Sequence, residues 1–318
     1  MALTSPAPVE FQTHRLELPA AAAGQRFDQA LAAALPQYSR ARLQRWIRTG
    51  AVLLGGRAAR ARERVRGGEQ VLVQAEFPPD ERLAAEALPL QVVYQDEALL
   101  VLDKPAGLVV HPGAGHRSHT LQNALLAHDP ALARVPRAGL VHRLDKDTSG
   151  LLLVARTPES HTWLVEALAA RRIGREYLAL VWGLPVGGAR IDEPIGRDRR
   201  ARTRMAVTAR GRAAVTHYRI ERRFRAHSLL RVSLETGRTH QIRVHLAHVG
   251  LPIVGDPVYG GRRRQVPGAG AALTAALAGF RRQALHAQRL HVPRPEGGEL
   301  TLEAPLPADF EALLAVLG

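Results

Sequence analysis

Cysteine is absent from this sequence of 318 residues. Its absence excludes disulfides, thiolate metal sites and cysteine nucleophiles, and it is compatible with the cytoplasmic location that we expect. Lysine is almost absent as well, because Lys104 and Lys146 are the only two lysines among 44 basic residues. A GC-rich coding bias accounts for an excess of arginine, so the two positions that kept lysine are the more notable ones.

Several patterns that mark common enzyme classes are also missing. The sequence has no G-x-S-x-G nucleophile elbow, no G-x-x-x-x-G-K-[ST] phosphate loop and no dinucleotide fingerprint after a strand. These absences argue against a serine hydrolase and against the binding of ATP or NAD. The sequence also lacks the set of convergent carboxylates that a metal-dependent nuclease needs. We therefore expect neither a cofactor nor a metal.

Long apolar runs are missing too. No window reaches the roughly 20 apolar residues of a membrane span, and residues 1–18 lack the basic start and apolar stretch of a signal peptide. We expect no membrane partner. The chain carries 44 basic against 29 acidic residues, a net charge of +15, which indicates a polyanion or an anionic surface as its partner.

The N-terminal part is predicted to hold a mobile tail, residues 1–24, which are rich in Pro and Ala, and then a small basic domain. Apolar residues at helical spacing predict a helix from Phe27 to Leu35 and a second helix around Trp46, followed by short strands. The second helix carries a row of arginines, namely Arg40, Arg42, Arg45 and Arg48. A solvated helix face and an RNA-binding face both fit this row.

A polar linker with prolines, residues 77–89, is predicted to precede a larger domain, residues 90–318. Helices are expected after Thr120 and after Thr157, with Leu164, Leu168 and Val165 of the latter facing the core. The predicted strands lie at 92–94, 99–102, 151–155, 178–181, 215–218 and 229–234. Because these strands follow one another without a repeating βαβ pattern, we predict an α+β fold with a mixed, mainly antiparallel sheet and flanking helices.

The stretch GLVHRLDKDTSGLLLVAR, residues 139–156, joins a dense polar loop to a short apolar run. The apolar run predicts a buried strand, so the polar residues before it lie where a rigid scaffold can aim side chains. Within the loop, Asp145 lies between Arg143 and Lys146. Local charge pairing in a solvated turn is one interpretation. Covalent or electrostatic carboxylate chemistry on RNA, without a cofactor, is the other.

Two further polar runs follow. In ETGRTHQIRVH, residues 235–245, Thr239 is expected to cap a helix. His240, His245 and His248 lack a matching carboxylate or cysteine pattern, so we expect them to form hydrogen bonds or contact RNA and not to bind a metal. The second run holds five arginines between residues 197 and 204. It fits a phosphate-binding loop and a merely solvated loop equally well.

Six runs occur together in the order of one known family: DKPAGLVVHPGAG, HRLDKDTSGLLLVA, REYLALVWG, LETGRTHQIRVHLAH, VGDPVYGG and RQALHA. This series resembles the RNA pseudouridine synthases, in the branch that acts on large-subunit ribosomal RNA and related substrates. The earlier run SRARLQRWIRTGAVLLGG resembles the RNA-binding domain first recognised in ribosomal protein S-four. The resemblances assign residues 25–76 to an S-four-like domain and residues 90–318 to a synthase domain.

The resemblance also implies three catalytic residues. Asp145 matches the family's essential aspartate, which attacks the target nucleoside at the uracil ring or at the anomeric carbon of the sugar. Arg243 matches the arginine that pairs with this aspartate. Tyr177 matches the tyrosine that stacks on the uracil and is proposed to help remove the proton from carbon 5, although an ordinary phenol has a pKa near 10.

Further positions are predicted to bind the substrate. Arg143 matches the side chain that replaces the flipped uridine in the stack, and Ile242 is expected to line the base pocket. His142 and Lys146, which flank them in the polar loop, are also assigned to substrate binding. In the S-four-like domain the resemblance implies phosphate contacts for the four arginines of the second helix.

The implied reaction is the isomerisation of uridine to pseudouridine in 23S ribosomal RNA, with the helix 69 region as the expected target. The expected partner is large-subunit ribosomal RNA or its precursor particle, and the expected state is a monomer. Two alternatives stay open: a synthase for tRNA or another ribosomal site, and an RNA-binding assembly factor that has no catalytic activity.

Overall fold

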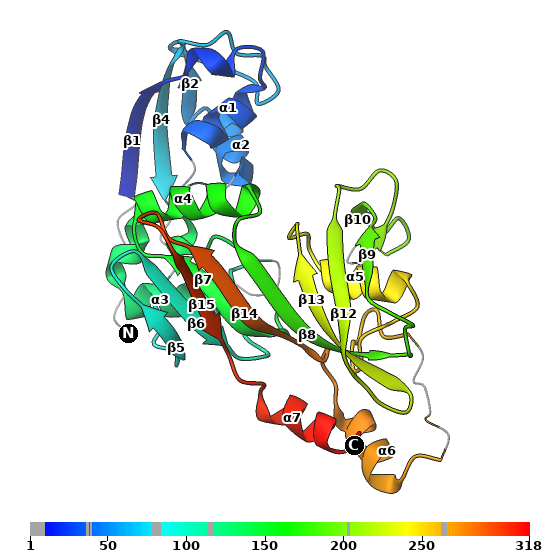
Figure 1. Cartoon of the computed structure of the whole chain (residues 1–318). Coiled ribbons are helices and arrows are strands. Elements are labelled where there is room, and N and C mark those ends of the chain that lie inside the picture. The colour runs from blue at the N-terminus through cyan, green and yellow to red at the C-terminus, as the bar shows by residue number, and fades with distance from the viewer. Residues whose placement is uncertain are drawn as a thin grey trace, which may run out of the picture. The chain divides into compact units, whose positions relative to one another are not determined.

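The computed structural model describes residues 10–35, 38, 40–77, 84–113, 118–201, 204–261, 266 and 268–318. The chain divides into two compact units, residues 1–85 with 133–137 and residues 86–132 with 138–318. Figure 1 colours the chain by residue number, from blue at the N-terminus to red at the C-terminus. The division falls inside the segment 77–89 that was predicted to be a linker, of which residues 78–83 lie outside the described part.

The N-terminal unit is a four-stranded antiparallel sheet, in the order β1-β4-β2-β3, packed against two helices. Its elements are β1 (Glu10–Glu17), the 3-10 turn η1 (Ala20–Ala22), α1 (Phe27–Ala34), α2 (Arg40–Thr49), β2 (Val52–Leu54), β3 (Arg57–Ala58) and β4 (Gln70–Phe77). Phe27, Leu43 and Trp46 belong to its buried core. The predicted pair of helices followed by a hairpin is confirmed.

The predicted mobile tail is wrong from Glu10 onward. Residues Glu10–Glu17 form β1, which pairs along its whole length with β4, from Glu10 opposite Phe77 to Glu17 opposite Gln70. Leu18, which follows, is fully buried. The partner strand lies more than fifty residues away in the sequence, so the local composition of residues 1–24 gave no sign of the pairing.

The second unit is built on a nine-stranded sheet in the order β5-β6-β7-β14-β8-β13-β12-β9, with β15 paired to β14. Its strands are β5 (Val92–Gln95), β6 (Leu99–Lys104), β7 (Ser149–Ala155), β8 (Gly174–Trp182), β9 (Ala189–Asp192), β12 (Val215–Arg223), β13 (His227–Leu234), β14 (Leu285–Pro293) and β15 (Glu299–Glu303). All neighbours run antiparallel except β7 and β14, which run parallel. The predicted α+β fold with a mixed, mainly antiparallel sheet is confirmed.

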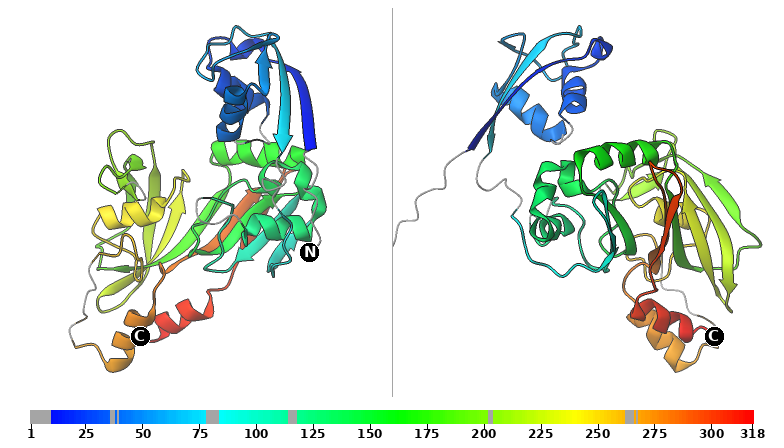
Figure 2. Two further views of the ribbon diagram at one scale, coloured as in Figure 1. Left: turned by 180° about the vertical axis from the view of Figure 1, so that it is seen from behind. Right: turned by 60° about the vertical axis from the view of Figure 1, so that its left-hand side comes forward.

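Short helices and a two-stranded ribbon complete this unit. They are α3 (Leu121–His128), α4 (Pro158–Ala169), the ribbon β10 (Ile195–Arg197) and β11 (Met205–Val207), α5 (Gln241–His248), α6 (Ala271–Gly279) and α7 (Ala308–Ala315). The 3-10 turns η3 (Pro130–Arg134) and η4 (Pro136–Gly139) are each divided between the two units, because residues 133–137 belong to the first. Figure 2 shows α6 and α7 side by side, and the rings of Phe280 and Phe310 lie 6.2 Å apart between them.

Two helices begin as their sequences predict. Thr120 caps α3 and Thr157 caps α4, each through a hydrogen bond that its side chain accepts from the backbone N–H three residues on. On α4, Leu164 is fully buried, as expected, but Val165 is 44% exposed, so its predicted place in the core is wrong. The helix covers the sheet with a narrower apolar face than its sequence suggested.

Strand β7 is the most deeply buried element, because every one of its seven residues is buried. It is flanked by β6 on one side and β14 on the other, which explains its continuous apolar sequence. The polar loop 142–148 leads directly into this strand and is therefore anchored in the core. Within the described part of the chain, no helix is long and apolar enough to cross a membrane.

A buried carboxylate holds the two helices of the N-terminal unit together. Asp28 on α1 is fully buried and accepts hydrogen bonds from Arg26, from Arg40 at the start of α2, and from Gln44. Burial by itself would raise the pKa of Asp28, but these donors lower it to about 2.

We predict that Asp28→Ala destabilises the N-terminal unit by about 2 kcal/mol, because α1 and α2 lose their shared anion. Hydrogen exchange of the α1 and α2 amides in the full chain measures this, with exposed Arg48→Ala as the control. The contribution of Asp28 should be complete above the ordinary carboxyl pKa of 3.8 and should disappear as the pH falls toward 2. Equal exchange rates in Asp28→Ala and wild type would contradict the assigned role.

Candidate active site

The polar loop before β7 is held in place by hydrogen bonds to β14 and to the segment that leads into it. Gln283 donates to the Thr148 hydroxyl at 3.0 Å, and the Ser149 hydroxyl lies 3.0 Å from His286 Nδ1. Gly150 has a φ of +109°, and a Cβ at this position would lie 2.2 Å from the Ala287 carbonyl oxygen. Only glycine allows this approach, so the parallel contact of β7 with β14 sets the position of the loop.

Lys104 fixes the same loop from the other side. Its ammonium group is buried and donates to the carbonyls of Pro105, Leu108 and Lys146, at 2.7, 3.0 and 2.9 Å. The Lys146 carbonyl also accepts the Gly107 N–H at 2.9 Å. Burial lowers the pKa of Lys104 to about 7, while the three acceptors match the three N–H groups of the charged form. The backbone next to Asp145 is thereby held in place.

Arg243 on α5 joins Asp145 to a second carboxylate. Its Nη1 donates to Asp145 Oδ2 at 2.9 Å, while Nε and Nη2 donate to the two oxygens of Asp256 at 2.7 and 2.9 Å. Asp256 Oδ1 also accepts the backbone N–H groups of Val258 and Tyr259. The guanidinium plane is therefore fixed by a bidentate pair on one edge and aimed at Asp145 with the other.

Burial and charge act in opposite directions on this pair. Burial by itself would lower the pKa of Arg243, but Asp256 and Asp145 raise it above its ordinary value. Burial would likewise raise the pKa of Asp256, and the hydrogen bonds from Arg243 lower it instead. The side chain of Asp256 is fully buried, whereas that of Asp145 keeps 16% of its surface exposed. Asp145 is the member of the triad that an external molecule can reach.

Tyr259 and His240 lie behind this triad. The Tyr259 hydroxyl lies 2.8 Å from His240 Nδ1 and accepts the backbone N–H of Met205, and its ring lies 5.0 Å from the Arg243 guanidinium carbon. His240 Nε2 is 3.9 Å from Asp145 Oδ1. Burial lowers the pKa of His240, which favours the neutral ring near neutral pH. These two residues support the position of Arg243 and Asp145.

The predicted cap of α5 is wrong. Thr239 does not cap the helix. The N-cap is His240, in the left-handed conformation with a φ of +56°, and it makes no capping hydrogen bond through its side chain. Its ring bonds to Tyr259 instead. The strained backbone turns the chain so that Ile242 and Arg243, both buried, enter the first turn of the helix.

Tyr177 lies in the middle of β8, between β13 and β14, and is 5% exposed. Burial raises the pKa of its hydroxyl, the positive charge of Arg175 opposes this rise, and the negative charge of Asp145 adds to it. The phenol is therefore neutral at neutral pH and is a poor base.

The remaining loop residues point in different directions. The side chains of Arg143 and Lys146 are on the exposed side. His142 turns inward, where its Nε2 accepts the Leu153 N–H at 3.0 Å, and its buried Nδ1 has no partner among the described residues. Burial lowers the pKa of His142 to about 3, helped by the charge of Arg175. His142 is therefore neutral, and its single ring proton sits on Nδ1.

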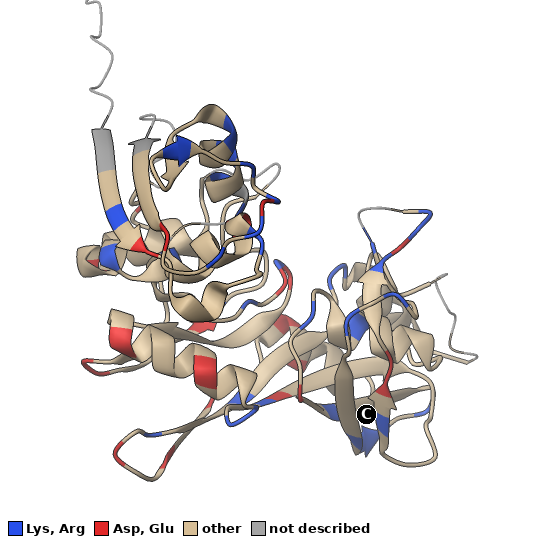
Figure 3. Cartoon of the chain, turned by 90° about the horizontal axis from the view of Figure 1, so that it is seen from above, with Lys and Arg blue, Asp and Glu red and all other residues tan. Residues whose placement is uncertain are grey.

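The four arginines of the N-terminal helix do not have equal surroundings. Arg40 is held by Asp28, so part of its hydrogen-bonding capacity is used inside the unit. Arg42 lies 6.0 Å from the centre of the Trp46 ring. Arg45 and Arg48 are exposed. Figure 3 shows that basic residues occur on both units, alongside fewer acidic ones.

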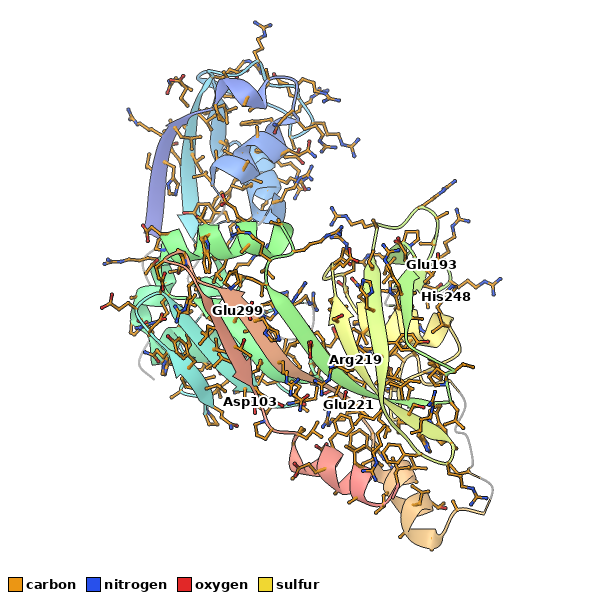
Figure 4. All side chains as sticks on the ribbon, viewed as in Figure 1. Asp103, Glu193, Arg219, Glu221, His248 and Glu299 are labelled. Atoms are coloured by element: carbon orange, nitrogen blue, oxygen red, sulfur yellow. The ribbon has the colours of Figure 1, made fainter. Side chains whose placement is uncertain are left out.

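The three histidines of the run 235–248 do not converge. His245 is buried and bonds to the Thr216 hydroxyl and to the backbone carbonyl of Glu193, at 2.9 Å each. His248, labelled with Glu193 in Figure 4, is exposed at the end of α5. Among the described residues, no three His, Asp or Glu side chains form a group that fits a metal ion.

The arginine-rich run 197–204 forms the connection of the β10–β11 ribbon, of which residues 202 and 203 lie outside the described part. Asp198 turns this connection by accepting the backbone N–H groups of Arg200 and Ala201. Arg204 folds back and donates to the carbonyl of Val258. The ribbon therefore touches the segment that holds Asp256.

Sequence reasoning identified Asp145 and Arg243 but missed Asp256, Tyr259 and the function of Lys104. A signal was present, because VGDPVYGG and DKPAG were recognised as runs of the same series. The single acid of VGDPVYGG and the single lysine of DKPAG were the residues to assign. Their partners lie far away in the sequence, so the runs alone did not show which contact each residue makes.

The comparisons with known proteins agree with this geometry. Residues 98–248 match the family model described as RNA pseudouridylate synthase, and residues 25–71 match the S4 domain model. The chain is 53% identical to "Ribosomal large subunit pseudouridine synthase D" of Xanthomonas campestris over 311 residues, which cover 98% of this chain and 94% of that protein. It is 51% identical to the protein of the same description from Escherichia coli, over 92% of this chain and 91% of that one.

Solved structures show the same fold at lower identity. "Human RNA Pseudouridylate Synthase Domain Containing 4" aligns with a TM-score of 0.56 and 27% identity, over 71% of this chain and 92% of the other. "Human RNA Pseudouridylate Synthase Domain Containing 1" aligns with a TM-score of 0.53 and 26% identity, over 70% and 86%.

We predict that Asp256→Asn lowers the free energy of unfolding by about 3 kcal/mol, because buried Arg243 loses its charged bidentate partner. Denaturant unfolding measures this. Asp309→Asn is the matched control, because Asp309 also holds an arginine bidentately, through Arg282, but is 51% exposed. The control should lose at most about 1 kcal/mol. Equal losses in the two variants would show that Asp256 does not anchor Arg243.

Proposed function

Because this chain belongs to the RNA pseudouridine synthase family, we propose that it converts uridine to pseudouridine in large-subunit ribosomal RNA, with the helix 69 region as its target. The observation that carries the proposal is the partly exposed carboxylate of Asp145, held at 2.9 Å by an arginine that is itself fixed by Asp256. Two relatives that match over nine tenths of the chain carry a ribosomal large-subunit description. The enzyme is an isomerase.

The reaction rearranges one nucleotide without adding or removing atoms. After the uridine leaves the stack, the Asp145 carboxylate attacks either the anomeric carbon of the ribose or the uracil ring. The bond between nitrogen 1 and the sugar breaks, the base turns, and carbon 5 bonds to the sugar in its place. A base takes the proton from carbon 5, and nitrogen 1 gains a proton. The bond to the aspartate breaks, so the carboxylate is released unchanged.

The surroundings of Asp145 suit this sequence of steps. A guanidinium that stays charged at any working pH gives the carboxylate that it binds a fixed orientation for attack. The pKa of Arg243 is raised, so its charge is constant. Because Arg243 is buried and doubly bonded to Asp256, it does not need to reorganise when the bond forms.

Tyr177 is proposed to provide the surface on which the flipped uracil stacks. Its buried, neutral ring suits stacking, which is worth about 1–3 kcal/mol per base and recovers part of the cost of flipping. The raised pKa of its hydroxyl does not favour the implied role in removing the carbon 5 proton. We therefore assign Tyr177 to binding and orientation of the base.

Arg143 is proposed to fill the space that the uridine leaves, since it is exposed and only two residues from Asp145. Ile242, 5% exposed and adjacent to Arg243, is proposed to line the base pocket. His142 is proposed to face the substrate through its free Nδ1–H. Lys146 is proposed to contact RNA through its exposed side chain, while its carbonyl serves Lys104.

The N-terminal unit is proposed to bind RNA phosphates through Arg42, Arg45 and Arg48. Arg40 contributes less than the sequence implied, because Asp28 occupies it. Such contacts add affinity without reading the base sequence. A cytoplasmic location and a monomeric state remain predictions, as do the two alternatives of another RNA target and an RNA-binding assembly factor.

We predict that Asp145→Asn lowers pseudouridine formation by roughly 1000-fold or more, because an amide is not a nucleophile, while RNA binding changes little. Single-turnover assays and filter binding on the same RNA measure the two quantities. Asp147→Asn, in the same loop, is the control and should keep activity within a few fold. Undiminished product from Asp145→Asn would remove Asp145 from its role and favour an assembly factor.

The target is tested by mapping pseudouridines in all RNA of a strain that lacks the gene. The proposal expects the loss of pseudouridine from the helix 69 region of 23S ribosomal RNA and its return on complementation. Loss confined to tRNA or to another ribosomal site would replace the proposed target with that one.

A further inference from the structure

Arg175 is the second residue of β8 and lies two residues before Tyr177, so both side chains point to the same face of the sheet. Arg175 is half-buried and its Nε is completely buried. Within the described part of the chain, this Nε has no hydrogen-bond partner, and no carboxylate lies within ion-pair distance of the guanidinium. A partly buried cation without a counter-ion therefore lies beside the proposed stacking surface.

Other buried arginines of the same unit are fully paired. Arg243 holds Asp145 and Asp256, and Arg231 on β13 holds Glu176 and Glu221, the latter labelled on β12 in Figure 4. Both arginines are less than one tenth exposed. An unpaired polar group at this depth costs stability, so the fold gains nothing by keeping Arg175 in this state. Arg175 suits a ligand that comes from outside the chain.

His142 Nδ1 is a second donor without a partner among the described residues. His142 Nδ1 is buried without a partner, and because Nε2 accepts the Leu153 N–H, the ring proton points from Nδ1. The positive charge of Arg175 acts to lower the pKa of both His142 and Tyr177. Arg175 and His142 thus offer one charged and one neutral donor, and within the described part of the chain neither Arg175 Nε nor His142 Nδ1 has a hydrogen-bond partner.

The segment that follows β13 passes close to the Arg175 guanidinium. A Cβ added to Gly237 would lie 3.0 Å from Arg175 Nη1, so the chain passes directly against the guanidinium. Arg175, His142 and Gly237 belong to three different runs of the family series, and Asp145 and Arg243 belong to two of these runs. Arg175 therefore lies on the sheet face of Tyr177 and against the segment that leads to Arg243.

We propose that Arg175 is a further substrate-binding residue, which holds a phosphate oxygen next to the flipped uridine, with His142 Nδ1–H donating to a second oxygen of the same nucleotide. The inference rests on the proposed function and deepens it. A phosphate fits better than a uracil carbonyl, because it supplies the negative charge that Arg175 lacks and offers several acceptor oxygens. Fixing the phosphate would keep the nucleotide in place while the base is detached and turns.

The test compares wild type with Arg175→Met and Arg175→Lys on a short target RNA, with and without an uncharged methylphosphonate at each phosphate that flanks the target uridine. Arg175→Met should lower kcat/KM roughly 10- to 100-fold, as expected for one charge-assisted hydrogen bond. Arg175→Lys should recover part of the loss. One methylphosphonate should lower kcat/KM of wild type by a similar factor and leave Arg175→Met unaffected.

Stability distinguishes binding from a structural role. Arg175→Met should unfold at the same or a higher denaturant concentration than wild type, because it removes an unpaired buried donor. Arg231→Met, which breaks a paired arginine in the neighbouring strand, should unfold earlier. Arg289→Met, whose arginine pairs with Glu303 on the other face of the sheet, should keep wild-type kcat/KM.

Each other outcome overturns the proposal. Undiminished kcat/KM in Arg175→Met would exclude a substrate contact, and a parallel loss of stability and activity would indicate a structural role. A 2-thio or 4-thio substitution of the target uracil could instead lower kcat/KM of wild type and leave Arg175→Met unaffected. In that case Arg175 binds a uracil carbonyl and not a phosphate. The activity of wild type on this RNA is measured before that of any variant. If wild type leaves the RNA unmodified, the result counts against the proposed target.

Discussion

The site depends on a single electrostatic arrangement, in which one buried guanidinium joins two carboxylates of unequal exposure. Arg243 gives two donors to fully buried Asp256 and one to Asp145, which stays reachable. The negative charge of Asp256 offsets the free-energy cost of burying the Arg243 guanidinium. The outer carboxylate is then oriented without being neutralised by a full bidentate pair. A reachable carboxylate in a fixed direction is what the proposed attack on the uridine needs.

This arrangement is only as firm as the loop that carries Asp145. The loop is tied at one end to β14 through Gln283 and His286, and in its middle to the buried ammonium of Lys104. The close approach of Gly150 to Ala287 allows the single parallel strand contact of the sheet. Lys104, Gly150 and the run RQALHA, which contains Gln283 and His286, thus serve the same purpose, which is to fix the backbone around Asp145.

Local patterns predicted the elements that form from neighbouring residues. The cap at Thr157, the apolar run that becomes β7 and the paired helices of the N-terminal unit were all visible in the sequence, because each depends on spacing within a few residues. Contacts between distant residues were not visible. Strand β1 looked like a tail because its partner β4 lies far along the chain, and Arg40 looked free because Asp28 lies on another helix.

The sequence by itself determined the family, the fold class and the identity of Asp145 and Arg243, because these follow from motifs and periodicity. Only the tertiary structure decided what each motif residue touches. It assigned Asp256 to Arg243, gave Lys104 three backbone carbonyls, and left Arg175 and His142 Nδ1 unused. The physical reason is that hydrogen bonding and charge compensation are properties of neighbours in space, and a sequence specifies them only through the folded chain.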